Sequence, residues 1–220
     1  MAERRAGRPA VPVLSRPMIA VAALELLDEG GEGGFTLSRL ADRLRVRPSA
    51  LYNHIDGKED IIAGVRELVS DRIDVSAFGE MEWSEAVMVW ARSYRKAFSA
   101  HPPTIALLAT LPLTGAARTI EMYESVARGF RDAGWPENEL LSAVVALESF
   151  ILGSALDAVA PDDMLNPAGL ESQAPVFAAA YARRADALAD RSVAEEAFEV
   201  GLAAMVGGLR ARLDALSRGT

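Results

Sequence analysis

The chain has 220 residues, 50% of them hydrophobic and 25% charged, which is enough for one large or two modest domains with a real core. It contains no cysteine, and this excludes disulfides, thiolate nucleophiles and zinc sites built on cysteine. The net charge of −8 at first argues against a nucleic-acid partner. However, the first 58 residues hold nine Lys and Arg against seven acidic residues, so the negative charge lies in the remainder. A basic head on an acidic body is typical of a polyanion-binding module joined to a domain of another function.

Neither a secretory signal nor a membrane span is expected. Residues 1–16 are rich in arginine but lack the apolar core and cleavage site of a signal peptide. The most apolar stretch, Leu140–Leu156, contains Glu148 and several serines, which favours a buried helix of a soluble protein. We therefore expect a cytoplasmic protein with no membrane partner.

Helical spacing of apolar residues recurs along almost the whole chain and strand signals are nearly absent, so the pattern predicts an all-α fold. An arm with prolines and arginines over residues 1–15 precedes a first helix over Arg16–Glu29, which Gly30-Gly31 should stop. A second helix is predicted over Thr36–Leu44, with the threonine as N-cap. A third is predicted over Pro48–Ile55, because proline suits the first helical position.

The rest of the chain reads as longer helices with short connections. Asp56 and Glu59 have the spacing of a capping box that opens a helix to about Val75, and Ser192 with Glu195 forms a second one. A proline-rich, acidic stretch over residues 160–175 is predicted to be a loop. Further helices are predicted over Ser84–Ala100, Thr104–Leu111, Thr114–Ala133 (stopped by Gly134), Pro136–Ala158, Val176–Leu188 and Ser192–Leu216.

The three short helices at the start, with a tight turn between the second and third, follow the helix-turn-helix plan. In the predicted third helix Leu51 and Ile55 face inward, while Ser49, Tyr52 and Asn53 lie on the opposite face. Hydroxyl, phenol and amide groups suit base edges and phosphates and place no negative charge against them. The sequence therefore predicts a DNA-reading head.

These residues resemble the signature of the TetR family of transcriptional regulators over about Met18 to Val69. The resemblance is carried by the run Thr36–Leu44, by Val46, by Leu51–Ile55, by Lys58-Glu59 and by Ile62. Downstream, Trp83, Tyr94, His101-Pro102, Gly134-Trp135 and Phe150–Gly153 resemble the ligand-binding domain of the tetracycline-repressor subgroup. The resemblance implies a helix-turn-helix domain over residues 16–62, a ligand-binding and dimerisation domain over residues 63–220, and a repressor that a small effector releases from DNA.

Roles in DNA binding follow from the resemblance position by position. Thr36 and Lys58 would hold phosphates. Arg4, Arg5 and Arg8 of the arm would enter a minor groove. Ser38, Arg47, Ser49 and Ala50 would lie nearest base edges, with Tyr52, Asn53 and His54 on the backbone or adjacent bases.

Two departures from the family pattern occur in the reading head. Arg45 stands where the family places glycine, so we expect a strained or differently shaped turn. Arg47 and Pro48 replace a usual hydroxyl cap and its polar neighbour, so we expect unusual base contacts.

A homodimer is expected from two rows of residues, one of small residues on the last predicted helix and a comparable one on the Pro136–Ala158 helix. In the family, these two helices pack against the same two helices of a second subunit and form a four-helix bundle across a two-fold axis. The expected interface residues are Ala143, Leu147, Phe150, Ser154, Ala197, Gly201, Ala204 and Gly208. The alternative is that both rows pack only within the chain.

An effector pocket is expected where three apolar helix faces meet, although such faces also build ordinary cores. Its expected residues are Trp90, Tyr94, Phe98, Leu108, Leu111, Tyr123 and Ala127. The effector would be an uncharged or weakly polar aromatic or macrocyclic compound. The subgroup's magnesium-binding histidine falls near Leu108, which cannot ligate a metal, and neither His54 nor His101 is assigned to one. No metal or cofactor is expected.

Other functions fit the sequence less well. The sequence shows no Gly-rich phosphate loop, no His/Asp/Glu set with metal-ligand spacing and no nucleophile elbow, so an enzyme is not expected. Two alternatives stay open: a DNA-binding regulator without an effector, and a helical protein-interaction adaptor.

Overall fold

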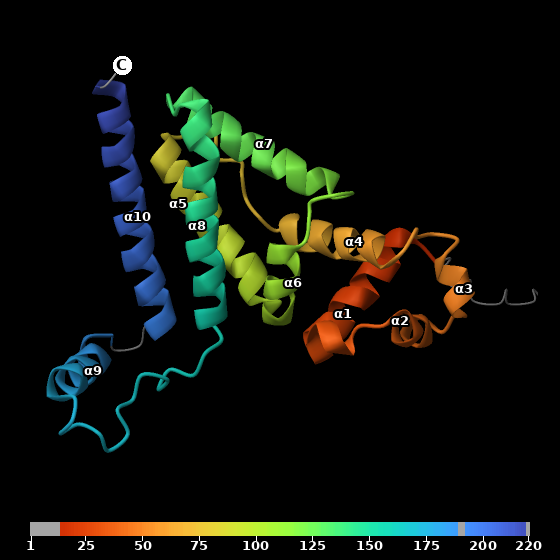
Figure 1. Ribbon diagram of the computed structural model, residues 1–220, viewed down its shortest axis with the longest axis horizontal. Coiled ribbons are helices and arrows are strands. Elements are labelled where there is room, and N and C mark those ends of the chain that lie inside the picture. Colours follow the sequence, from red (N-terminus) through yellow and green to blue (C-terminus); the bar gives the residue numbers. More distant parts are fainter. Residues whose placement is uncertain (1–13, 189–191, 219–220) are drawn as a thin grey trace, which may run out of the picture.

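The protein, described here by a computed structural model over residues 14–188 and 192–218, is built of helices, which confirms the all-α expectation (Figure 1). The arginines of the arm (Arg4, Arg5 and Arg8) lie outside the described residues. The helices are α1 (Arg16–Gly34), α2 (Leu37–Leu44), α3 (Pro48–Leu51), α4 (Lys58–Ser70), α5 (Trp83–Ser99), the 3-10 helix η1 (Pro102–Thr104), α6 (Ile105–Thr110), α7 (Ala117–Asp132), α8 (Glu137–Asp157), α9 (Pro175–Leu188) and α10 (Val193–Arg218).

Local signals fix the first helices as expected. Gly31 has φ +58°, and this left-handed residue interrupts α1 at the predicted stop, although one more helical turn follows it to Gly34. The Thr36 hydroxyl accepts a hydrogen bond from the backbone N–H of Arg39 at 3.2 Å, so the predicted N-cap of α2 is confirmed. Pro48 occupies the first turn of α3, which is shorter than predicted and continues as turns to Ile55.

The predicted capping box at the start of α4 is wrong by one residue. The helix begins at Lys58 after Gly57, so the third helical position is Asp60 and not Glu59. The Asp60 carboxylate accepts the backbone N–H of Asp56 at 3.2 Å. The helix also ends at Ser70, short of Val75, since the next N–H groups, of Arg72 and Ile73, make turn bonds to the carbonyls of Val69 and Ser70. The Asp74 N–H then donates to the Ser93 hydroxyl of α5 at 2.8 Å.

The larger body packs α5 against α8 and α10, with α7 across α8 (Figure 1). Its core contains the fully buried side chains of Trp90, Phe130, Leu147 and Phe198. The Glu195 carboxylate, expected as part of a second capping box, lies in the first turn of α10 and pairs with Arg95 of α5 at 2.6 Å.

Head and body share one helix. The predicted boundary between residues 62 and 63 falls inside α4, which runs unbroken and packs on α1 at one side and on α7 at the other. The head also docks on η1, where the His101 Nδ1 lies 2.7 Å from the Asp28 carboxylate of α1.

Candidate functional site

The outward face of the third helical segment has the geometry that the sequence predicts. Leu51 and Ile55 are buried, and Leu51 is fully enclosed. Ser49 and Asn53 are exposed, and Tyr52 is 56% exposed. Polar groups are thus presented to solvent on a rigid apolar base, which is the arrangement that base and phosphate readout needs.

The turn before α3 keeps its shape despite Arg45. This residue adopts φ 55° and ψ 40°, the left-handed conformation that glycine takes at lowest cost, and its N–H bonds back to the last turn of α2. A non-glycine residue there costs roughly 1–2 kcal/mol. The expected strain is therefore present, but the turn is not differently shaped.

Two of the basic residues near the reading face are engaged within the head. Arg43 pairs with Glu29 and Glu25 of α1, and its hydrogen bond lowers the pKa of Glu29. Arg39 donates to the Gly34 carbonyl at 2.5 Å. Arg47, the residue before α3, is exposed, and its side chain makes no polar contact within the described part of the chain. Arg47 therefore remains available to DNA.

The phosphate-binding candidates lie at helix starts that flank the reading face. Thr36 and Ser38 are exposed at the start of α2, and Lys58 is the first residue of α4. The Lys58 ammonium lies 3.5 Å from Glu32 and 5.7 Å from the centroid of the Phe35 ring. His54 is half-buried and Ala50 only partly exposed, so they offer less to DNA than their neighbours.

Sequence reasoning missed Arg16 as a positioning residue of the head. Its Nε donates to the His54 carbonyl at 2.6 Å, and its Nη2 lies 2.9 Å from the Asp60 carboxylate. Arg16 thus ties α1 to the end of the reading segment and to the start of α4. An arginine at the first position of a helix gives no distinctive signal of this.

The residues expected to line an effector pocket divide into three groups. Trp90, Tyr94, Phe98 and Leu108 are buried and close-packed, with Tyr94 and Phe98 stacked at a centroid distance of 5.0 Å. Leu111 lies at the surface after α6. Tyr123 and Ala127, in contrast, line a cavity.

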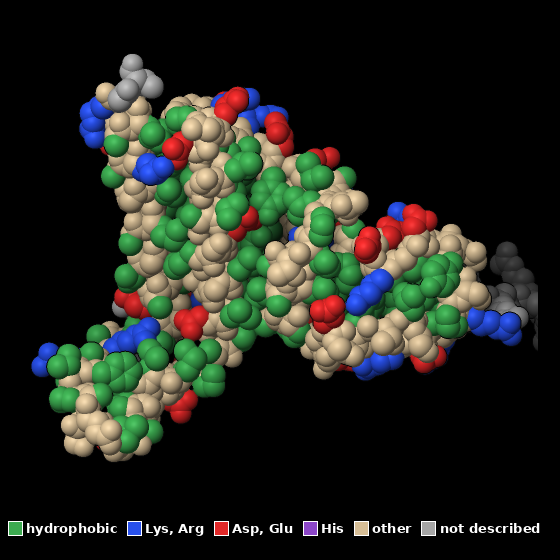
Figure 2. Space-filling model, viewed as in Figure 1, with side chains coloured by type: hydrophobic (Ala, Val, Ile, Leu, Met, Phe, Trp, Pro, Cys, Tyr) green, Lys and Arg blue, Asp and Glu red, His purple; other side chains and the backbone are tan. Residues whose placement is uncertain are grey.

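This cavity, of about 450 Å³, lies between α7 and α8 and is here called the α7–α8 cavity. Residues at helical spacing form its two walls. On the face shown in Figure 2, hydrophobic side chains gather between these helices. The lining residues are Leu113, Ile120, Tyr123, Glu124, Ala127, Leu141, Val144, Val145 and Glu148.

One polar cluster lies at the inner wall of the α7–α8 cavity, and sequence reasoning did not assign it. The Glu148 carboxylate accepts hydrogen bonds from Tyr123 at 2.5 Å and Tyr94 at 3.2 Å through one oxygen, Oε1. Burial raises the pKa of Glu148 and the pKa values of both tyrosines, and it lowers the pKa of the nearby Arg66. The available signal was a single acidic residue inside the most apolar stretch of the sequence.

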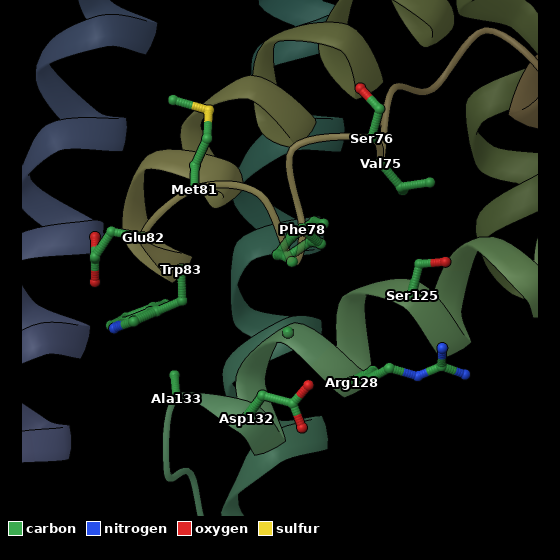
Figure 3. A pocket seen from close by; sticks show the side chains of 12 residues that line it. Val75, Ser76, Phe78, Met81, Glu82, Trp83, Ser125, Arg128, Asp132 and Ala133 are labelled. Atoms are coloured by element: carbon green, nitrogen blue, oxygen red, sulfur yellow. The ribbon is translucent and has the colours of Figure 1, made fainter.

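A larger hollow, of about 650 Å³, lies between the segment after α4 and α7 (Figure 3). Phe78 projects into it and Trp83 lies at its edge, but its rim carries Glu82, Arg128 and Asp132, all exposed. Charged, solvated rims do not favour an apolar guest. The smaller α7–α8 cavity is therefore the better candidate for an apolar effector.

The residues expected at a dimer interface need correction on α8. Ala143 and Leu147 are buried within the subunit and cannot meet a partner. Phe150 stacks on Phe198 at 5.6 Å and covers Gly201, and the Ser154 carbonyl accepts a hydrogen bond from Arg95, so these contacts are also internal. Ala197, Ala204 and Gly208 of α10 are exposed as expected. The exposed apolar residues of α8 are instead Leu141, Val145 and Leu156.

The fold and the reading face define a helix-turn-helix DNA-binding protein with a helical regulatory domain. Residues 19–65 match the family described as bacterial regulatory proteins, tetR family, and residues 77–213 match the tetracyclin repressor-like C-terminal domain. The chain belongs to the TetR family of bacterial regulatory proteins.

Individual relatives agree. The chain is 31% identical to the tetracycline repressor protein class A from transposon 1721 of Escherichia coli, over 87% of this chain and 88% of that protein. It is 29% identical to a transcriptional regulator of the helix-turn-helix type from Saccharopolyspora erythraea, over 65% of this chain but only 60% of that protein's length. A solved TetR structure from Streptomyces coelicolor is 30% identical, with a TM-score of 0.69, over 90% of this chain and 99% of that one.

Proposed function

We propose that two copies of this chain bind a near-palindromic operator, and that a small, mostly apolar effector in the α7–α8 cavity releases them. The observation that carries the proposal is the outward placement of Ser49, Tyr52 and Asn53 on the buried base of Leu51 and Ile55. In a dimer, two such faces would occupy successive major grooves about one helical turn apart.

Fluorescence anisotropy with labelled DNA from the region flanking the protein's own gene tests DNA binding. We expect affinity to fall steeply as salt rises, because phosphate contacts release counterions. Tyr52→Ala combined with Asn53→Ala should abolish specific binding without loss of fold, since both side chains are exposed. Glu121→Ala, an exposed change on α7, is the control and should bind as the parent does. A double variant that binds as well as the control would refute the assignment.

The dimer is supported by an apolar surface on α8 and α10. In the described part of the chain, α8 is the one helix long and apolar enough to cross a membrane, and 33% of that apolar window is buried within the subunit. Since α8 packs on α5, α7 and α10, its inner face belongs to the body, and its Leu141 and Val145 line the α7–α8 cavity, but Leu156 remains 49% exposed. Val200, on α10, is 62% exposed. A second copy would cover this surface.

Contacts between the cavity and α4 support a route for the response. The Arg118 backbone N–H, at the start of α7, donates to Glu67 of α4 at 2.8 Å. The Arg66 guanidinium, also on α4, donates to the Leu111 carbonyl at 2.8 Å. Because the α7 residues that line the cavity follow Arg118 directly, an effector that moves α7 would move α4 and with it the head.

Filling the cavity tests the effector site. Ala127→Trp should close the space between α7 and α8, so that compounds which release the parent from its operator no longer do so, while DNA binding is retained. Ala109→Trp, an exposed change on α6, is the control. If the same compounds still release the Ala127→Trp variant from its operator, the effector binds elsewhere in the protein.

The proposal includes a cytoplasmic location, where the operator lies, and a binding role without catalysis. The relatives are regulators, which supports both. A helical adaptor would also explain the apolar surface of α8, but it would leave the exposed reading face without a role.

A further inference from the structure

The α7–α8 cavity combines apolar walls with a single carboxylate that is only half satisfied. Glu148 Oε1 accepts both tyrosine hydroxyls, at 2.5 and 3.2 Å. In the described part of the chain no donor reaches the other oxygen, Oε2, and Glu148 lines the cavity. A carboxylate oxygen is thus available to whatever fills the space.

The protein supplies little else to balance this carboxylate. The groups that face it are Tyr94 of α5, Tyr123 of α7 and Arg66 of α4. The Arg66 guanidinium donates to the Leu111 carbonyl and does not line the cavity. Burial raises the pKa of Glu148 in spite of Arg66, which shows that desolvation outweighs the stabilising contacts. A buried charge of this kind is costly until a further donor reaches it.

We propose that Glu148 determines the class of effector: a flat, apolar body that carries a protonated amine, whose N–H donates to Oε2. This rests on the proposed function of the cavity as the effector site. The amine supplies the missing donor and a neutralising charge, while the apolar body packs between Ile120 and Val144. The sequence led us to expect an uncharged or weakly polar effector, and the placement of Glu148 changes that expectation.

The same carboxylate excludes anionic compounds. A ligand carboxylate or phosphate would meet the largely buried Glu148 carboxylate at the inner wall, and like charges there repel each other. Glu124, the second acid on the cavity lining, is exposed and pairs with Arg128 at 3.0 Å, so it is largely neutralised by its own partner. The selection therefore falls on Glu148 and not on Glu124, which makes Glu124 a matched control.

Three probes with one tricyclic body and different charge test this: 9-aminoacridine, protonated at pH 7.5; acridine, neutral; and acridine-9-carboxylate, anionic. Binding to the full-length protein without DNA is followed by probe fluorescence. We expect the amine to bind roughly tenfold or more tightly than acridine, and the carboxylate more weakly than acridine. Glu148→Gln should reduce the preference to about twofold or less while acridine binding is kept, and Glu124→Gln should leave the preference unchanged.

Other outcomes separate this inference from the proposed function. Suppose that Ala127→Trp blocks binding of the probes, so that the cavity is the binding site. The role of Glu148 is then overturned if Glu148→Gln keeps the preference for the amine, or if the parent protein binds all three probes equally. The proposed function of the cavity would still stand. If Ala127→Trp leaves binding of every probe unchanged, the cavity is not the effector site and both proposals fail. Binding of none of the probes by the parent would also overturn the inference.

Discussion

Replacing Gly208 by alanine tests whether this face of α10 is a dimer interface or is exposed to solvent. A Cβ added at Gly208, or at the adjacent Gly207, would meet no heavy atom within 4 Å in the subunit. In an isolated subunit the change therefore fills open space and removes the helix cost of glycine, a gain of about 1 kcal/mol. Monomer stability should rise.

In the proposed dimer the same methyl group enters the two-fold interface from both copies. Overpacking of a close interface typically costs 1–3 kcal/mol, which corresponds to a rise of roughly fivefold to a hundredfold in the dimer dissociation constant. Sedimentation equilibrium measures this constant, and thermal unfolding at a concentration well below it measures the stability of the subunit alone. Both the dissociation constant and the unfolding temperature of the subunit should rise for Gly208→Ala, so that the dimer weakens while the subunit becomes more stable.

Gly201→Ala is the matched control on the same helix. Its Cβ would lie 2.6 Å from Phe150 Cε2 within the same subunit, so the change should disturb the α8–α10 packing and lower the stability of the subunit itself. The reasoning would be refuted if Gly208→Ala raised thermal stability and left the dimer dissociation constant unchanged, because the glycines would then face solvent.

Three further predictions concern the head and the cavity. Leu51→Ala removes a fully buried side chain and should lower the free energy of unfolding by about 2–5 kcal/mol in urea titrations, with loss of operator binding. Lys58→Ala removes an exposed charge whose pairing with Glu32 contributes little to stability; it should weaken binding to all DNA sequences alike and reduce the salt slope by about 0.9 in anisotropy titrations at several KCl concentrations. A mutant with a sequence-dependent loss would contradict that role. Glu148→Gln should remove a pH dependence. Because the folded pKa of Glu148 is raised, the native state binds more protons than the unfolded state between the two pKa values, so parent stability falls as pH rises through that window. Urea unfolding at pH 5 and pH 8 should show a smaller fall for Glu148→Gln than for the parent.

The head was predictable because its signals are local. The Thr36 cap, the position of Pro48 and the left-handed Gly31 each act within a few residues of chain, and the structure has all three. The inward placement of Leu51 and Ile55 follows from helical spacing alone. The capping box at Asp56 was misplaced because a one-residue shift in the helix start exchanges Glu59 for Asp60 at the capping position.

The faces of α8 were not predictable in the same way. This helix is apolar around much of its circumference, so its sequence does not indicate which side meets the body and which meets a partner. Ala143 and Leu147 face inward and Leu141 and Val145 face outward, although both pairs have helical spacing. The role of Glu148 depends on Tyr94 and Tyr123, which lie 54 and 25 residues away in the sequence. Only the packing of three helices brings them together.

Because α4 lies between the head and the cavity, the effector needs to change only a few of the contacts of α4 to affect DNA binding. A useful response needs a coupling of about 1–3 kcal/mol between the two sites. The α4 helix is held to the cavity side by the hydrogen bond from Arg66 to the Leu111 carbonyl, by that from Arg118 to Glu67, and by that from the Thr119 hydroxyl to Ser70. Each contributes about 0.5–1.5 kcal/mol net. Loss or gain of two or three of them as α7 moves would supply the whole coupling, so a shift of α7 large enough to exchange those partners is sufficient, and the head itself need not be deformed.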